Sequence, residues 1–249
     1  MSRKGKTAPF DDGRKITLVL NGGIMTGVVG TGATTALEEL GLTDAFDYIF
    51  TFSAGLPNAS YFLAHQALLS STVYIDDLSN SKFINFWKIW NIANIKYLIH
   101  ILKDVKTLNV QKIFESKTKL FVQIKNITKN EVEFLELNES FKQNYFKLIE
   151  AAVDMPILCP GAIVINGTKY KDYTNGTEEE FIENILKYEA ITDLLIIYNY
   201  PSQKEYISTD KNILEIIPKD EIHKIETRSR ILKKGCEDME NLVKNIFAS

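Results

Sequence analysis

The first seventy residues alternate between short apolar runs and helix-forming segments, and this alternation restricts the fold more than any other feature of the chain. An apolar run at residues 16–20 leads into a glycine-rich loop, after which a helix is expected over 34–40. A second apolar run at 46–52 ends at Ser53, and a second helix is expected over 56–69. Strands that alternate with helices in this way favour a parallel sheet with helices on its faces.

The rest of the chain continues this pattern. Apolar runs predict further strands over 120–125, 132–137, 163–165, 169–171, 194–198 and 213–217. Asn166-Gly167, between two of these runs, is the strongest hairpin signal in the chain. Further helices are expected over 78–104, from Asn138 to about 153, from Thr177, and from about 228. No linker or repeat divides the chain, so we expect one domain over 15–249 after a disordered lead-in over 1–14.

The composition excludes several classes of protein. The 249 residues are enough for one sizeable core, and a hydrophobic content of 45% argues against disorder. The net charge of −3, with acids and bases interspersed, gives no basic field for nucleic acid. Two cysteines, Cys159 and Cys236, are too few for a disulfide scaffold and are expected to be free thiols. With no secretory signal pattern and no run long enough to span a membrane, a cytoplasmic protein is expected.

Three features that could take part in catalysis follow the apolar runs in order. The glycine loop lies after the first run, Ser53 after the second, and Asp172 after the predicted hairpin. A serine between a strand and a helix is the arrangement in which several hydrolases expose a nucleophile. Each feature also has a structural explanation by itself, and a glycine loop is common in nucleotide-binding folds. The loop here has neither the phosphate-loop motif nor the G-x-G-x-x-G spacing.

The three features are part of a longer set of matching segments that runs from about residue 16 to 201. The segments are Asn21-Gly22-Gly23, Gly27-Val28-Val29-Gly30, residues 36–42, Phe46-Asp47, Ser53-Ala54-Gly55 with Asn58 and Ala59, Tyr74, Asp77-Leu78 and residues 151–156. Together and in this order they resemble the patatin-like phospholipases. The resemblance implies a single-domain, three-layer α/β fold with a mostly parallel central sheet flanked by helices.

The resemblance also implies a lipid acyl hydrolase that uses a Ser–Asp dyad. Ser53 would attack an ester carbonyl, and Asp172 would accept the serine proton and later activate water. Backbone N–H groups would hold the oxyanion, and one such donor is worth roughly 3–4 kcal/mol. The residues that would supply these groups are Gly22, Gly23, Ile24 and Ala54.

The resemblance implies neither a metal ion nor a cofactor. The expected partners are lipid esters or a membrane surface, which the protein would contact peripherally and transiently. The protein would then associate with membranes. The aromatic residues of 83–102 are expected either to line an acyl-chain channel or to cover the sheet. The three histidines, His65, His100 and His223, are expected to be structural or solvated rather than catalytic.

The loop departs from the family pattern at two positions. Ile24 replaces the third glycine, and Thr26 replaces an arginine that precedes Gly27. A β-branched residue resists the positive φ that glycine tolerates. If the third loop position requires that conformation, the oxyanion site is expected to be distorted.

The elbow and the aspartate motif also depart from the family pattern. Thr51 replaces the first glycine of the elbow, while the second, Gly55, is retained. Tyr173 and Thr174 follow Asp172 where the family has glycine or alanine, and they could displace the carboxylate. We expect Thr51 and Gly55 to support the elbow, as Thr26 and Gly27 support the loop.

Three hypotheses for the function follow. The first is a lipid acyl hydrolase whose activity is reduced by the altered motifs. The second is an inactive patatin-like protein that binds lipid or a protein partner, and the third is an unrelated α/β nucleotide-binding protein. The position of Asp172 relative to the Ser53 hydroxyl, with the direction of the Gly23 and Ile24 amides, distinguishes the first two.

Overall fold

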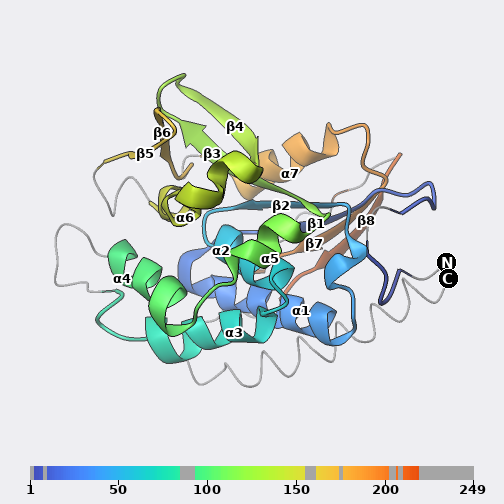
Figure 1. Ribbon diagram of the computed structural model, residues 1–249. Helices are drawn as coiled ribbons and strands as arrows, with labels where there is room; N and C mark the ends of the chain where they lie inside the picture. Colours follow the sequence, from blue (N-terminus) through green and yellow to red (C-terminus); the bar gives the residue numbers. More distant parts are fainter. Residues whose placement is uncertain are drawn as a thin grey trace.

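The described residues form one mixed, eight-stranded sheet between two layers of helices (Figure 1). The computed structural model describes residues 3–7, 10–84, 93–154, 161–173, 176–201, 206 and 210–218. The strand order is β5-β6-β3-β2-β1-β7-β8, and β4 pairs with the free side of β3. The predicted three-layer α/β class with a largely parallel sheet is thereby confirmed.

Parallel strands form the centre of the sheet. It consists of β1 (Ile16–Leu20), β2 (Tyr48–Phe52), β7 (Asp193–Ile197), β8 (Asn212–Ile216) and the first part of β3 (Lys119–Asn126). Antiparallel pairs add β4 (Glu131–Glu136), β5 (Ile163–Ile165) and β6 (Thr168–Lys171). All five residues of β1 and of β7 are buried, as expected for strands that are covered on both faces.

The helices divide between the two faces of the sheet. Their bounds are α1 (Val28–Glu39), α2 (Gly55–Leu63), α3 (Ala67–Thr72), α4 (Ile95–His100), α5 (Val110–Glu115), α6 (Tyr145–Val153) and α7 (Glu178–Leu186). Short 3-10 or π turns occupy Ile24–Gly27, Thr43–Ala45, Val73–Leu78, Ile101–Val105 and Glu139–Asn144. Helix α7 lies on the opposite face from α1, α2 and α3 (Figure 1). Among the described residues, no helix has both the length and the apolar character needed to cross a membrane.

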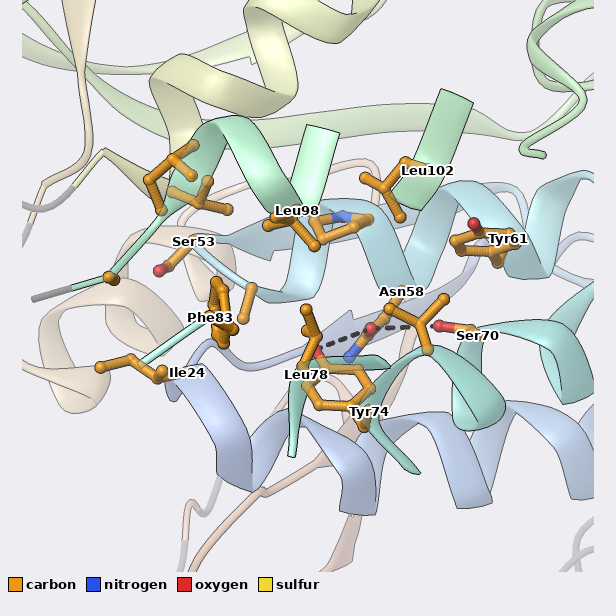
Figure 2. A pocket seen from close by; sticks show the side chains of 16 residues that line it. Ile24, Ser53, Asn58, Tyr61, Ser70, Tyr74, Leu78, Phe83, Leu98 and Leu102 are labelled. Atoms are coloured by element: carbon orange, nitrogen blue, oxygen red, sulfur yellow. Dashed lines mark hydrogen bonds between the residues drawn. The ribbon is translucent and has the colours of Figure 1, made fainter. Parts of the chain in front are cut away.

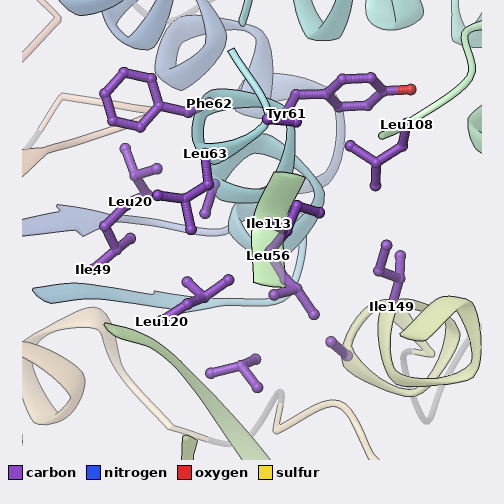
Figure 3. Close-up of a cluster of buried hydrophobic side chains, with 14 of the residues drawn as sticks. Leu20, Ile49, Leu56, Tyr61, Phe62, Leu63, Leu108, Ile113, Leu120 and Ile149 are labelled. Atoms are coloured by element: carbon purple, nitrogen blue, oxygen red, sulfur yellow. The ribbon is translucent and has the colours of Figure 1, made fainter. Parts of the chain in front are cut away.

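Two hydrophobic clusters form because side chains alternate across each strand. Leu18 and Leu20 of β1 join the larger cluster, which lies against α2, α5 and α6 (Figure 3). Val19, between them, joins the smaller cluster under α7 with Phe50 and Phe181. The central strands are thus covered on both faces.

All eight predicted strands are present in the structure, with ends that differ by at most two residues, but two helices differ from the prediction. The helix expected over 34–40 begins at Val28. The buried Gly30 can take part in this helix because its N–H donates to the side chain of Asn199, which is distant in sequence. The helix expected over 56–69 is interrupted at His65, which adopts a φ of 56°. The His65 and Gln66 N–H groups donate back to α2 carbonyls, a Schellman motif without the usual glycine.

Other predictions differ in part or lie outside the described residues. Residues 79–84, expected to be helical, form turns and a bridge between Ile84 and Ala93. Within the predicted disordered lead-in, Arg3 is buried and its guanidinium contacts the Asp12 and Asp47 carboxylates. Residues 85–92, both cysteines, His223 and the helix expected from about 228 lie outside the described residues.

Candidate active site

Ser53 lies on a strained turn between β2 and α2. Its φ is 48°, in the left-handed region that costs a non-glycine residue about 1–3 kcal/mol. The Leu56 N–H donates to the Ser53 carbonyl at 3.0 Å, so the helix begins directly after the turn. Only 8% of Ser53 is exposed. This is the geometry of a nucleophile elbow, in which the serine hydroxyl is presented at the end of a strand.

Gly55 allows Thr51 to occupy the elbow. A Cβ atom at Gly55 would lie 2.1 Å from Thr51 Oγ1 and 2.5 Å from the Leu20 carbonyl oxygen, distances that no real Cβ atom tolerates. Thr51 is fully buried, and its hydroxyl has no hydrogen-bond partner among the described residues. The second glycine of the elbow therefore provides the space that a threonine in place of the first glycine requires.

The glycine loop packs directly against the elbow. A Cβ atom at Gly22 would lie 2.6 Å from the Phe52 ring and 2.9 Å from the Ser53 Cβ. The Gly23 carbonyl accepts hydrogen bonds from the Thr26 N–H at 2.9 Å and from the Thr26 hydroxyl at 2.6 Å. Thr26 thus closes the loop through both its backbone N–H and its hydroxyl. The backbone of the loop is thus brought against Ser53.

Ile24 adopts the conformation that a β-branched residue resists. Its φ is 48°, so the third loop position does require left-handed geometry in this protein. The side chain is partly buried against the main core, and it lines both of the cavities that meet at Ser53. The replacement of glycine by isoleucine therefore strains the loop while its left-handed turn is retained.

The register of β3 brings Asp172 to the level of Ser53. On one side of β3, Phe52 of β2 pairs with Gln123, and beyond this pair Lys171 of β6 pairs with Lys125. The other side of β3 is occupied by β4, so β6 must lie on the same side as β2. Because β6 is antiparallel to β3, the next residue, Asp172, turns back toward the end of β2. Sheet pairing thus places residues 119 positions apart in sequence at one point.

The Asp172 carboxylate is buried without a well-formed hydrogen bond. Asp172 is 3% exposed, and neither carboxylate oxygen has a partner in hydrogen-bonding geometry among the described residues. Burial raises the pKa of Asp172 to about 7, and the charge of Asp154 adds to this rise. The nearby Ser53 hydroxyl and Tyr173 N–H oppose the shift in pKa but do not cancel it. The result is a carboxyl group poised between its two protonation states near neutral pH.

Two cavities meet at Ser53. The first, of about 50 Å³, is almost wholly apolar and extends from Ser53 toward Leu102 and Tyr61 (Figure 2). The second, of about 370 Å³, is more open and more polar, and Asp172, Tyr173 and Tyr200 line it. Ser53 and Ile24 line both cavities. The serine hydroxyl therefore stands at the boundary between an apolar channel and an open polar mouth.

Asn58 ties the helix after the elbow to the glycine loop. Its amide nitrogen donates to the Gly27 carbonyl at 3.0 Å, and its amide oxygen accepts from the Tyr74 and Ser70 hydroxyls (Figure 2). Burial raises the pKa of Tyr74 above its ordinary range, so its hydroxyl remains a donor. Gly27 thereby contributes a carbonyl that fixes the loop to the start of α2.

Sequence reasoning missed two residues at the site. Asn199, two residues after the end of β7, donates its amide to the Asn21 and Gly22 carbonyls. Glu178, at the start of α7, accepts from the Asn21 amide and bonds to Tyr200, and burial raises its pKa to about 7. A polar residue at the carboxyl end of a buried strand was the available signal for Asn199. Nothing in the sequence distinguishes Glu178 from the two glutamates that follow it.

The described histidines lie away from Ser53. His65 is paired with Asp44 at 3.5 Å, and His100 is paired with Asp104 at 2.7 Å on an exposed part of the surface. In the described part of the chain, no three His, Cys, Asp or Glu side chains are grouped as a metal ion would require.

The comparisons with known proteins agree at the level of fold. The sequence matches no protein-family model and none of the curated proteins. The structure aligns with VipD from Legionella pneumophila at a TM-score of 0.55 and 12% identity, covering 96% of this chain and 68% of VipD. The fold resembles that of VipD. This likeness supports the predicted three-layer α/β fold, and at 12% identity it shows the fold alone.

A second solved structure is more distant. ExoU of the Pseudomonas aeruginosa type III secretion system, in its complex with SpcU, aligns at a TM-score of 0.44 and 11% identity. The alignment covers 98% of this chain and 54% of ExoU, so the chain spans about half of that protein's length.

The buried Asp172 carboxyl should make stability fall as pH rises. Since its pKa in the folded state is about 7, the unfolded chain releases this proton first, and stability is lost between about pH 4 and 7. We expect Asp172→Asn to have a higher free energy of unfolding than the wild type at pH 8. This advantage of the variant should be about 3 kcal/mol larger at pH 8 than at pH 4. Urea denaturation at the two pH values measures the difference.

Asp193→Asn is a control of opposite sign. Burial raises the pKa of Asp193, but hydrogen bonds from Arg14, Thr192 and Asn212 outweigh it and lower the pKa overall. This substitution should destabilise the protein at both pH values, because the Asp193 carboxyl of the folded protein stays ionised down to below pH 4. An Asp172→Asn advantage of equal size at both pH values would contradict the assignment.

Proposed function

We propose that the protein is a lipid acyl hydrolase in which Ser53 is the nucleophile and Asp172 the general base. The observation that carries the proposal is the meeting of a strained serine, a buried carboxyl and a glycine loop at the junction of two unlike cavities. A carboxyl with a pKa near 7 is suited to accept a proton at neutral pH. The patatin-like fold supports the assignment by analogy.

In the proposed reaction, Ser53 Oγ forms a bond to the ester carbonyl carbon while its proton passes to Asp172. The carbonyl oxygen becomes an oxyanion, which N–H groups of Gly22, Gly23, Ile24 or Ala54 stabilise. As the intermediate collapses, the bond to the alcohol breaks and Asp172 returns the proton to it. Water then gives a proton to Asp172 as its oxygen attacks the acyl-enzyme carbonyl. The bond from the acyl carbon to Ser53 Oγ breaks, Asp172 returns the proton to the serine oxygen, and the fatty acid is released.

The two cavities suit the two ends of a lipid ester. The walls of the narrow cavity are apolar from Val73 to Leu102, as an acyl chain requires. The open mouth at Asp172 and Tyr200 would hold the polar remainder of the lipid. Such a substrate lies in a membrane or micelle surface, so we propose a protein that acts peripherally and transiently at that surface.

The alternative is an inactive lipid- or protein-binding member of the same fold class. Two observations favour it: Ile24 is strained, and no hydrogen bond in good geometry joins Ser53 to Asp172 among the described residues. Catalytic hydrogen bonds are often loose before substrate binds, so this geometry is compatible with both functions.

A covalent probe decides between the two. The wild type should hydrolyse a nitrophenyl butyrate ester and react with a fluorophosphonate at Ser53, whereas Ser53→Ala should lose both, with hydrolysis at least about 10³-fold slower. Peptide mass spectrometry locates the adduct. Ser140→Ala, an exposed serine in the turn before α6, is the control and should behave as the wild type. A wild type that forms no adduct and hydrolyses no ester would favour the binding function.

The pH dependence should report the Asp172 carboxyl. Since only its ionised form accepts a proton, kcat/KM should rise with pH through an apparent pKa of about 7. Glu178 has a pKa near the same value, so Glu178→Gln serves as the control and should leave the midpoint unchanged. A midpoint that moves in Glu178→Gln would assign the titration to the glutamate instead.

The apolar cavity should set the acyl-chain length. Leu98→Trp fills the cavity and should lower kcat/KM for decanoyl and longer esters by about 10-fold or more relative to butyryl esters. Leu68→Trp is the matched control, because Leu68 is 60% exposed on α3 and lies outside the cavity. Equal losses for short and long chains in Leu98→Trp would argue against an acyl channel.

A further inference from the structure

A single side chain after β7 holds the glycine loop from behind. Asn199 is 1% exposed, and its amide nitrogen donates to the Asn21 carbonyl at 2.5 Å and to the Gly22 carbonyl at 2.7 Å. Its amide oxygen accepts from the Gly30 N–H at 2.9 Å. The Asn199 side chain therefore joins two consecutive loop carbonyls to the first turn of α1.

The chemistry of these partners fixes the orientation of the amide. The two loop partners are carbonyl oxygens, which only accept, and the α1 partner is an N–H group, which only donates. A reversed amide would lose all three hydrogen bonds. The Gly30 N–H is also one of the helix-start donors that have no partner within α1, and Gly27, the residue before the helix, supplies no side chain to cap it.

Peptide planarity transmits this anchoring to the N–H groups of the loop. In a trans peptide the carbonyl and the following N–H point in opposite directions. Because Asn199 holds the Asn21 and Gly22 carbonyls, it directs the N–H groups of Gly22 and Gly23 away from itself. Among the described residues none accepts a hydrogen bond from either N–H, and the Gly22 backbone lies against Ser53.

We propose that Asn199 is the positioning residue of the oxyanion site. It holds the Gly22 and Gly23 amides toward the place where negative charge develops, next to Ser53. Ile24 gives this anchor its importance, because the strained residue that follows would relax if the preceding peptide could rotate. The proposal rests on the hydrolase function proposed above.

Asn199→Asp removes the donor and keeps the shape of the side chain. An aspartate oxygen would face the two loop carbonyls and repel them, so both peptides should rotate. For nitrophenyl butyrate we expect kcat to fall about 10²-fold while KM changes less than about threefold, because an oxyanion donor acts only in the transition state. An unchanged kcat in a folded variant would overturn the proposal.

Asn126→Asp is the matched control. Asn126 is also 1% exposed, and its side chain bonds to Glu133 of β4 and to the Lys129 N–H of the β3–β4 turn. Its backbone pairs with both β4 and β6, but neither Asn126 nor its two side-chain partners line the cavities at Ser53. It should show a comparable loss of thermal stability with kcat within about twofold of the wild type. A similar fall in kcat in both variants would attribute the effect to stability and overturn the proposal.

A second readout does not depend on activity. In protein labelled with ¹⁵N-glycine, Asn199→Asp should shift the Gly22 and Gly23 amide resonances and change their exchange with water, while Asn126→Asp should not. If the wild type has no esterase activity, the proposed function fails, and these resonances still test the anchor. Unchanged Gly22 and Gly23 resonances in Asn199→Asp would refute it.

Asn199→Ser covers the case in which the aspartate variant does not fold. Its hydroxyl can donate to one carbonyl at a time, so kcat should fall less than in Asn199→Asp but by at least about fivefold. A serine variant with wild-type kcat and wild-type Gly22 and Gly23 resonances would likewise overturn the proposal.

Discussion

The site depends on the fact that β3 continues beyond the end of β2. The last residue of β2 pairs with Gln123, and the free side of the remaining part of β3 pairs with β6. A strand that changes partner in this way creates a corner, where the parallel strand ends and the antiparallel strand arrives. Ser53 leaves the sheet at this corner, and Asp172 enters it. The glycine loop completes the arrangement, because β1 is the parallel neighbour of β2 and ends beside it.

The corner is held in a conformation that costs free energy. Ser53 and Ile24 both have positive φ, and Asp172 is buried without a well-formed hydrogen bond. Such strain persists only where the surrounding structure determines it, and here two buried clusters fix the central strands from both faces. Strained residues and a carboxyl with a perturbed pKa occur together where the two cavities meet. This combination is typical of functional sites.

Much of the fold and the location of the candidate site could be predicted from the sequence. Apolar runs identify strands because burial is a local property of side-chain composition, and the Asn166-Gly167 turn is specified by its own residues. Features that depend on distant partners could not be predicted. The early start of α1 depends on contacts from Asn199, and the break at His65 lacks the glycine that usually signals one.

By itself, the sequence determined the order of the elements and the residues that could carry chemistry, because local composition selects strands, turns and small residues. The tertiary structure alone decided how these residues meet: the register of β3 brings Asp172 to Ser53, and Asn199 anchors a loop 177 positions before it. It also decided that Ile24 adopts the left-handed conformation, since packing on both sides of the loop outweighs the local preference of a β-branched residue. Local preferences set the candidates, and sheet pairing and burial chose among their arrangements.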